Sequence, residues 1–244
     1  MNMETARKKI VVLSGAGISA ESGLQTFRGG NGLWDNYPVE EICSVQGWAK
    51  NPAKVTEFYN IRRAQLAEVE PNMAHRILAQ MQEDFDIRII TQNVDNLHER
   101  AGSRGVLHLH GELTKVRPQD CYTEKDKYST EYVQDIGYEP VKIGDVGGPR
   151  LKQLRPHVVF FGEAVPNLSK AARLVQQADV LLIIGTSMAV YPAAGLVHYA
   201  QDGCDVYMID PSDSAVGMVM GVNHIQKVAT EGMKEFREIM EREK

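Results

Sequence analysis

The chain has 244 residues, with 27 basic and 32 acidic side chains and a formal net charge of −5. This length suffices for one large domain or for a domain with an insertion, and the acidic balance argues against nucleic acid as a direct partner. No apolar run is long enough to cross a bilayer and the N-terminus shows no cleavage pattern, so we expect a cytoplasmic enzyme without a membrane partner.

The first predicted strand, Lys9 to Ser14, leads directly into a glycine turn. The turn GAGISA at residues 15–20 has the GxGxxA spacing that opens a helix beneath a dinucleotide pyrophosphate. Gly15 allows the tight turn, and Gly17 lets backbone N–H groups approach the phosphates. Because such turns are often plain connections between a strand and a helix, the motif alone leaves both interpretations open.

A glycine-punctuated loop follows where a dehydrogenase would place its second strand. Such enzymes carry an acidic residue at a strand end about 20 residues after the turn, whereas here the next convincing strand begins only at Ile87. Long loops inside compact domains are usually functional. We interpret this loop as a flap over the nicotinamide end of a dinucleotide, with Phe27 covering that end and Arg28 anchoring it.

The rest of the chain alternates between apolar runs suited to buried strands and helical patterns. This alternation predicts an α/β core with a doubly wound parallel sheet. Strands are expected at Ile87 to Thr91, Val106 to Leu109, Val158 to Phe161, Val180 to Gly185 and Asp205 to Ile209. Helices are expected at Ala74 to Phe85, Leu168 to Ala178, Pro192 to Gln201 and Thr230 to Lys244, with Thr230 as an N-cap.

Two segments do not fit this alternation and predict a smaller inserted domain. One is mostly helical, from Trp34 to Glu70, and the other, from Arg117 to Arg155, mixes tyrosines with charges. We therefore expect one catalytic domain over residues 1–244. Its large subdomain would cover about 8–33, 71–113 and 156–244, and its small subdomain about 34–70 and 114–155.

Polar residues cluster where the strand Ile87 to Thr91 ends. Gln92, Asn93 and Asp95 follow at once, and this edge of an open α/β sheet is where ligands bind. A single such residue would more simply cap the next helix, but the cluster exceeds what a cap requires. Asn93 and Asp95 could hold a carboxamide, which offers one acceptor and two donors.

Two histidines follow in Leu107-His108-Leu109-His110-Gly111, and strand alternation puts both on one face. A lone histidine is more often structural, but His110 ends its strand beside a glycine at the ligand edge. An imidazole is suited to take a proton from a sugar hydroxyl near neutral pH. We favour His110 over His108 as the base.

Tyr59 and Arg62 share one face of a predicted helix. A guanidinium beside a phenol can bind a carboxylate at the end of an acyl chain. Spacing alone favours a plainer interpretation, in which Phe58 and Ile61 face the core and Tyr59 and Arg62 cover its edge.

Several motifs together resemble those of the sirtuins, the NAD-dependent protein-lysine deacylases. They occur in the order GAGISAESGLQTFRG, TQNVDNLH, HLHGEL, LRPHVVFFGE and GTSMAVYPAAGL. The resemblance covers Lys9 to about Pro211 and is clearest to the bacterial branch that also removes acidic acyl groups. It implies a Rossmann-like fold with a smaller domain, and a reaction in which the acyl-lysine carbonyl attacks C1′ of the nicotinamide ribose.

By the same resemblance, His110 deprotonates a ribose hydroxyl, and the products are nicotinamide, 2′-O-acyl-ADP-ribose and free lysine. Acyl groups would include acetyl, succinyl and malonyl. A protein ADP-ribosyltransferase and a catalytically silent NAD-sensing module are the alternatives. His110 argues against a catalytically silent module. The Tyr59 and Arg62 pair argues for acyl-lysine as the substrate.

The resemblance also implies roles for individual residues. His110, Asn93 and Asp95 are the expected catalytic residues. The peptide would pair as an added strand with Phe161, Gly162 and Glu163, and the pair Tyr59 and Arg62 matches the Tyr-x-x-Arg of sirtuins that accept succinyl-lysine, with Cys43 lining the acyl pocket. The expected NAD-binding residues are Gly15, Ala16, Gly17, Ser19, Thr26, Phe27, Arg28, Trp34, Gln92, Asn93, Asp95, Gly185, Thr186, Ser187, Asp210 and Ala229.

The chain departs from the sirtuin pattern at two places. Most sirtuins hold the small domain with four zinc-bound cysteines, but here only Cys121 falls in that interval, and one thiolate cannot build a structural zinc site. We expect a zinc-free module packed by its tyrosines and by Val133, Ile136, Val141 and Ile143. Asp210 stands where the family commonly places an asparagine near the adenosine ribose, and a carboxylate there can still accept from ribose hydroxyls.

Overall fold

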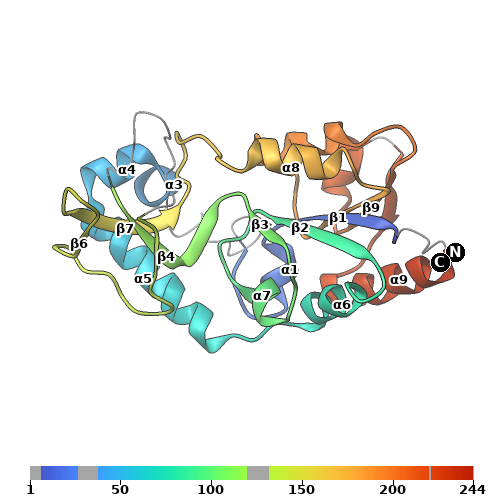
Figure 1. The fold of residues 1–244 in the computed structure, drawn as a ribbon, viewed down its shortest axis with the longest axis horizontal. Coiled ribbons are helices and arrows are strands. Elements are labelled where there is room, and N and C mark those ends of the chain that lie inside the picture. The colour runs from blue at the N-terminus through green and yellow to red at the C-terminus, as the bar shows by residue number, and fades with distance from the viewer. Residues whose placement is uncertain (1–6, 27–37, 120–131, 220, 244) are drawn as a thin grey trace, which may run out of the picture.

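A six-stranded parallel sheet forms the centre of the larger part of the molecule (Figure 1). The computed structural model describes residues 7–26, 38–119, 132–219 and 221–243. The strand order is β3-β2-β1-β8-β9-β10, and all neighbours pair in parallel. The strands are β1 (Lys9–Ser14), β2 (Asp86–Thr91), β3 (Val106–His108), β8 (Val180–Ile184), β9 (Asp205–Ile209) and β10 (Asn223–Ile225).

The order of the strands reverses beside the first one. From β1 the chain adds β2 and β3 on one side, then returns to place β8, β9 and β10 on the other. Ligands of open α/β sheets bind beyond the carboxyl ends of the strands at such a reversal. The predicted doubly wound, Rossmann-like fold is confirmed, and its expected binding edge lies between β1 and β8.

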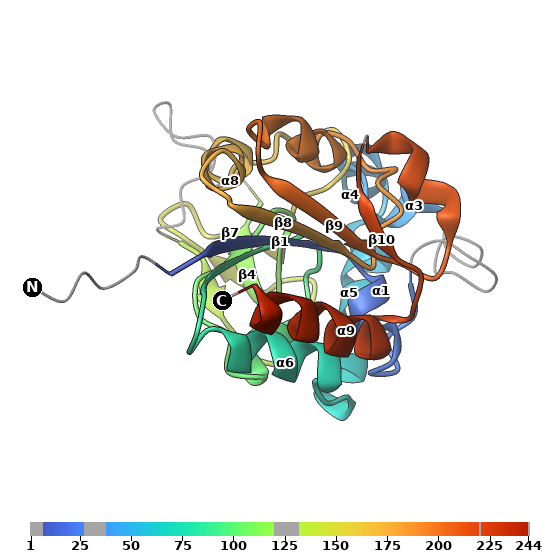
Figure 2. The same cartoon turned by 90° about the vertical axis from the view of Figure 1, so that its right-hand side faces the viewer.

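Helices cover both faces of this sheet (Figure 2). On one face lie α6 (Met73–Met81) and α9 (Ala229–Arg242), and on the other lie α8 (Leu168–Val175) and the 3₁₀ helix η1 (Ala193–Tyr199). Shorter helices at the edges are α1 (Gly17–Ala20), α7 (Leu97–Arg100) and the 3₁₀ helix η2 (Asp213–Met218). Because both faces are covered, the central strands β1 and β8 are almost entirely apolar rather than alternating.

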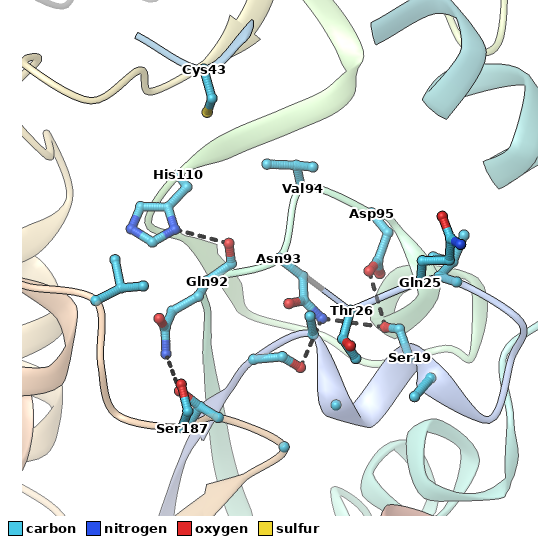
Figure 3. Close-up of a pocket in the computed structure, with 18 of the residues that line it drawn as sticks. Ser19, Gln25, Thr26, Cys43, Gln92, Asn93, Val94, Asp95, His110 and Ser187 are labelled. Carbon is cyan, nitrogen blue, oxygen red and sulfur yellow. Dashed lines mark hydrogen bonds between the residues drawn. The ribbon is translucent and has the colours of Figure 1, made fainter. Parts of the chain in front are cut away.

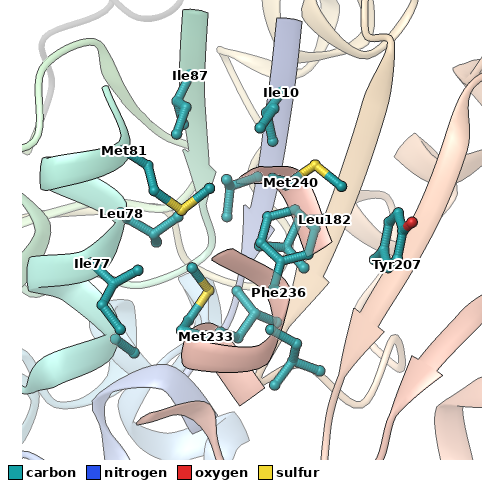
Figure 4. Packing of buried hydrophobic residues seen from close by; sticks show 14 of the residues in the cluster. Ile10, Ile77, Leu78, Met81, Ile87, Leu182, Tyr207, Met233, Phe236 and Met240 are labelled. Atoms are coloured by element: carbon teal, nitrogen blue, oxygen red, sulfur yellow. The ribbon is translucent and has the colours of Figure 1, made fainter. Parts of the chain in front are cut away.

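The face under α6 and α9 is packed by flexible and aromatic side chains (Figure 4). Met81 from α6 and Phe236 from α9 meet Ile10 of β1 and Leu182 of β8 in one buried cluster. Val11 of β1 points the other way, into the cluster beneath α8 and η1. The alternation of β1 between the two clusters anchors the strand that carries the glycine turn.

Within residues 38–119 and 132–158, the smaller part combines three helices with a second, antiparallel sheet. Its sheet order is β5-β4-β7-β6, around a small core of Val116, Val141 and Leu154. The helices are α3 (Val39–Ile42), α4 (Val45–Lys50) and α5 (Pro52–Glu68), and the strands are β4 (Gly111–Pro118), β5 (Gln134–Asp135), β6 (Val146–Gly147) and β7 (Lys152–Val158). Strand β4 begins before residue 114 and β7 ends after residue 155, so the sheet extends slightly beyond the predicted limits of the small subdomain. The subdomain limits themselves stay a prediction.

Helix α5 is fastened to the second sheet by buried polar side chains. Asn51 caps its first turn by accepting from the Lys54 amide at 3.0 Å. Asn60 Nδ2 donates to the carbonyl of Val141 at 2.7 Å, and Asn60 Oδ1 accepts from the Val141 amide at 2.9 Å. The fully buried Arg63 donates from Nε to the carbonyl of Leu113 at 2.8 Å. Side chains of α5 thus bond both β4 and the segment between β5 and β6.

The structure corrects several predicted elements. Val158 to Phe161 is not a strand of the parallel sheet: Val158 ends β7, and Phe161 forms an isolated bridge to Ser44. The expected helix from Pro192 is a 3₁₀ helix.

Helix α9 begins after Val228. Thr230 is not its N-cap, because the Thr230 hydroxyl donates to Glu21 Oε1 at 2.7 Å. In the segment between β5 and β6, Tyr138 and Ile143 are exposed rather than packed. Among the described residues, no helix combines the length and apolar character that crossing a membrane requires.

Candidate active site

A cavity of about 640 Å³ opens where the carboxyl edge of the large sheet faces α5 and the end of β7. This volume is typical of sites that enclose a cofactor or substrate. Two regions of its wall differ in construction. We call the loops after β1, β2 and β8 the cofactor end, and we call the wall formed by Tyr59, Arg62 and Cys43 the acyl end.

Glycines interlock two loops of the cofactor end. The Gly17 amide donates to the carbonyl of Gly185 at 2.8 Å, and the Gly15 amide donates to the carbonyl of Ile184 at 3.0 Å. A Cβ built on Gly17 would lie 2.7 Å from Cα of Gly185, and one on Gly15 would lie 2.7 Å from Cβ of Thr186. Glycine is therefore required here by the contact between two loops, in addition to any approach of a phosphate.

A hydrogen-bonded chain of side chains fixes Asn93 and Asp95 in the cavity wall (Figure 3). Asn93 Nδ2 donates to the carbonyl of Gly15 and to Ser19 Oγ, both at 3.2 Å, and Ser19 Oγ donates to Asp95 Oδ2 at 3.0 Å. Because the amide N–H groups of Asn93 are engaged, its Oδ1 is the atom that it presents as an acceptor. Asp95 also accepts from the Leu97 amide at 3.1 Å, so it caps α7 as well.

His110 lies in the cavity, and one of its ring nitrogens is already engaged in a hydrogen bond. Its Nδ1 is 3.0 Å from the carbonyl of Gln92, and since a carbonyl only accepts, Nδ1 carries the proton in the neutral ring. Nε2 is then the basic nitrogen. Burial lowers the pKa of His110 from its ordinary value of 6.5, so the ring is neutral at physiological pH. Gln92 in turn donates from Nε2 to Thr186 Oγ1 at 3.0 Å.

At the acyl end, α5 turns Tyr59 into the cavity and leaves Ile61 exposed. Tyr59 is 4% exposed and Ile61 is 44% exposed, so the plainer interpretation with Ile61 in the core is wrong. The Tyr59 hydroxyl donates to Cys43 Sγ at 3.2 Å, and Arg62 NH1 donates to Gln65 Oε1 at 2.8 Å. Both donors therefore meet neutral acceptors, which are weaker than a carboxylate.

Burial sets the charges of these side chains. It raises the pKa of Tyr59 well above its ordinary value of 10, so the phenol remains a donor at neutral pH. It also raises the pKa of the Cys43 thiol, which stays protonated. Burial lowers the pKa of Arg62, but a guanidinium keeps its charge at neutral pH. The acyl end thus offers one neutral donor and one cation.

The Sir2 family profile matches residues 15–192 of this chain. That span covers most of the sequence and includes the loops after β1, β2 and β8 as well as the second sheet. The chain belongs to the Sir2 family.

Relatives within the Sir2 family match along almost the whole chain. A protein of Bacteroides thetaiotaomicron named NAD-dependent protein deacylase is 49% identical over 235 residues, 96% of this chain and 98% of the relative. A Helicobacter pylori protein of the same name is 48% identical over 230 residues, 94% of this chain and 96% of the relative.

Solved Sir2 structures share the fold as well. A mutant Sir2 homologue bound to ADP ribose has a TM-score of 0.84 at 37% identity, covering 96% of this chain and 94% of that chain. A Sir2 homologue bound to NAD has a TM-score of 0.81 at 37% identity, covering 97% and 91%.

Within this Sir2 fold, the remaining predicted cofactor residues fall into two groups. Ala16, Thr26, Gly185, Ser187, Asp210 and Ala229 line the cavity. Phe27, Arg28 and Trp34 lie outside the described residues. The carboxylate of Asp210 accepts from the Ser212 amide at 2.9 Å, and burial raises the pKa of Asp210.

A buried ionic cluster behind the cavity was not expected from the sequence. Glu163 is fixed by Arg155 at 2.7 Å and by Arg117 at 3.2 Å, and it also accepts from the Phe160 amide at 2.8 Å. The guanidinium of Arg155 stacks on Phe160 with CZ 3.7 Å from the ring centroid. The side chain of Glu163 is therefore committed inside the protein, where it holds the cavity wall, while the predicted strand pairing of this segment with a peptide stays a prediction. The available sequence signal was limited to Arg155, eight residues before Glu163, because Arg117 is far away in the chain.

The described residues contain no group of three or more side chains suited to binding a metal ion. Cys121 lies outside them, so the expectation of a zinc-free module stays a prediction.

Proposed function

We propose that this protein removes acyl groups from lysine side chains of other proteins with NAD, and that it accepts succinyl and malonyl groups alongside acetyl. Family membership and the shared name of the relatives confirm the predicted class, an NAD-dependent protein deacylase. The residues of the cofactor end suit a dinucleotide, since backbone amides, Asn93 and Asp95 converge at the strand reversal. The preference for acidic acyl groups is the finer part of the proposal.

His110 is the proposed base. Bound NAD supplies the electrophilic ribose carbon and the ribose hydroxyls. Because Gln92 holds Nδ1–H, the lone pair on Nε2 is available to take the proton of such a hydroxyl. Asn93 and Asp95 orient the ribose and the carboxamide, one through Oδ1 and the other through its carboxylate. The apolar wall from Val158 to Phe160 limits access of water to the reacting atoms.

One observation carries the acidic acyl preference: Tyr59 and Arg62 both line the cavity that contains His110. In the view of Figure 3, His110 and Val94 lie between Cys43 and the loops of the cofactor end. A carboxylate at the end of an acyl chain is a better acceptor than either Cys43 or Gln65, so it would take both donors. A methyl group would gain neither bond.

The acylated peptide is proposed to add as a strand beside Phe161 and Gly162. The Phe161 amide already donates to the carbonyl of Cys43, and the Phe161 carbonyl accepts from Val45. Within the described residues the structure gives the Gly162 amide no acceptor, and Gly162 is therefore the proposed point of pairing. A Sir2 variant with a deacetylated p53 peptide and 3′-O-acetyl ADP ribose, 27% identical at a TM-score of 0.75, shows that a member of this fold holds a peptide.

Mass spectrometry of acetyl-lysine and succinyl-lysine peptides with NAD tests both parts of the proposal, NAD-dependent deacylation and the acceptance of acidic acyl groups. We expect the wild type to remove both groups. Arg62→Met should lower kcat/KM for the succinyl peptide by about 10- to 100-fold, the value of a lost charge-assisted hydrogen bond, and change deacetylation by less than about 3-fold. Arg173→Met, on the exposed side of α8, is the matched control.

Two outcomes would contradict the proposal at different levels. Full desuccinylation by Arg62→Met would remove the acidic acyl preference and leave deacylation intact. A peptide that gains the mass of ADP-ribose instead of losing its acyl group would point to ribosyl transfer.

A further inference from the structure

A second histidine, behind the cavity wall, is enclosed by hydrogen-bond acceptors. His108 ends β3 and is 8% exposed. Its Nδ1 lies 2.9 Å from the carbonyl oxygen of Asn93, and its Nε2 lies 2.9 Å from Oε1 of Glu99 on α7. A backbone carbonyl and an ionised carboxylate accept hydrogen bonds but have no proton to donate.

The Glu99 side chain is 40% exposed and its pKa is lowered by the bond from His108, so we take Glu99 as ionised, and counting protons then fixes the charge of the His108 ring. A neutral imidazole carries one N–H, so one of the two contacts would place a nitrogen lone pair against an oxygen lone pair. An imidazolium carries two N–H groups and satisfies both contacts. The arrangement therefore fits a charged His108 opposite an ionised Glu99.

We propose that His108 is a positioning residue of the deacylase, working as an imidazolium that is paired with Glu99 and that holds the carbonyl of Asn93. The held carbonyl fixes the backbone from which the Asn93 side chain reaches Gly15 and Ser19 at the cofactor end. This inference rests on the proposed role of Asn93 in holding NAD.

The same loop is secured from two further sides. The Leu113 amide donates to the carbonyl of Val94 at 2.7 Å, and Asn167 Nδ2 donates to the carbonyl of His108 at 2.8 Å. His108 therefore sits on a fixed frame, and a change in its own charge acts on Asn93.

The surrounding titratable groups agree with this assignment. Burial alone would lower the pKa of His108, but the hydrogen bond and charge of Glu99 raise it overall, with help from Glu112 on β4. Burial likewise opposes ionisation of Glu99, yet the bond from His108 lowers its pKa. Asp95, in the loop before α7, adds a further negative charge whose influence reaches His108.

The neighbouring histidines provide the contrast. His98 on α7 shares a hydrogen bond with Ser14 Oγ at 3.0 Å, and burial lowers its pKa well below 6.5. Burial lowers the pKa of His75, on α6, to about 4. These two rings are neutral at pH 7, while His108, bonded to a carboxylate, is charged.

The sign of the pH dependence follows from the raised pKa of His108. The free energy with which the charged ring stabilises the fold is fully present below about pH 6.5, the pKa of a histidine in an unfolded chain. This stabilisation is lost as the pH rises through the raised pKa of the folded state. We expect an alkaline decline in kcat/KM for NAD from His108. Protonation of His110, the proposed base, should instead cause a decline in activity at low pH.

NMR of the histidine rings in the full-length wild-type protein tests the charge without any assay of activity. We expect both ring nitrogens of His108 to carry protons at pH 7 and the ring to titrate above pH 6.5. A midpoint at or below 6.5 would overturn the inference while leaving deacylation untouched.

Kinetics of two matched variants test the positioning role. Glu99→Gln removes the carboxylate bonded to His108, whereas Glu112→Gln removes a nearby charge that is bonded to Lys115. We expect Glu99→Gln to raise KM for NAD about 10-fold with kcat within about 2-fold, and to move the alkaline decline about one pH unit lower. Glu112→Gln keeps both hydrogen bonds of His108, so it should leave KM for NAD unchanged and lower the alkaline decline by much less than Glu99→Gln does. Equal profiles for the two variants would contradict the role, and if Glu99→Gln does not fold, the wild-type titration decides.

Discussion

The two ends of the cavity are built in different ways. At the cofactor end, backbone groups of loops after β1 and β8 bond each other, and glycines let the loops touch. At the acyl end, the wall consists of side chains, Tyr59 and Arg62 from α5 and Cys43 from the segment between α3 and α4. An end made of backbone is fixed by the fold, while an end made of side chains changes with a few substitutions.

This contrast explains which property each end controls. The cofactor end also holds His110 through the Gln92 carbonyl, so under the proposed function the chemistry would depend on strand positions that the whole sheet enforces. The proposed choice of acyl group would instead depend on a helix that Asn60 and Arg63 fasten to the smaller part of the molecule. We expect substitutions at the two ends to affect different kinetic constants.

Loss of the imidazole of His110 would test the cofactor end most severely. His110→Ala should lower kcat for both acetyl and succinyl peptides by about 10²- to 10⁴-fold, the usual contribution of a general base. Peptide mass spectrometry and nicotinamide release measure the loss, with circular dichroism to check the fold and exposed His198→Ala as control. Unchanged turnover would show that another group takes the proton.

A smaller change would sharpen the role of the acyl end. In Cys43→Ala the hydroxyl of Tyr59 loses its sulfur acceptor and the pocket widens. We expect the ratio of desuccinylation to deacetylation to rise by about 2- to 10-fold, the value of one neutral hydrogen bond. A ratio equal to that of the wild type would mean that Tyr59 does not reach the acyl carboxylate.

No effect is expected from removing metal. Because Asn60, Arg63 and the cluster of Phe58 and Leu66 with Leu113 hold the second sheet to α5, a strong chelator should shift the melting temperature by less than about 1 °C, unlike a domain whose folding depends on zinc. Elemental analysis of the purified protein should find less than about 0.1 zinc per chain. Stoichiometric zinc, or unfolding on chelation, would contradict this prediction.

Much of the fold was predictable because buried parallel strands are apolar on both faces. Residues 9–14 and 205–209 match β1 and β9. The same rule misplaced Val158 to Phe161, since a segment buried between α5 and β4 is just as apolar as a central strand. β10 was missed because it is short, lies at the sheet edge and contains the polar residues Asn223 and His224.

The site was predictable where function requires glycine or a polar cluster at a strand end, as at Gly15 and Asn93. It was less predictable where tertiary packing decides. The exposure of Ile61 and the burial of Tyr59 depend on which side of α5 meets the second sheet. The pairing of Glu163 with Arg155 likewise depends on how the chain turns after β7.

The contact between Gly17 and Gly185 has a consequence for motion. Backbone packed directly on backbone leaves no side chain that could change rotamer, so the loops after β1 and β8 move as one rigid body with the sheet. Adjustment to peptides of different shape is then expected from the opposite wall, where the side chains of α5 line the cavity. We therefore expect that any closure around a bound substrate carries α5 toward these loops and leaves the loops themselves in place.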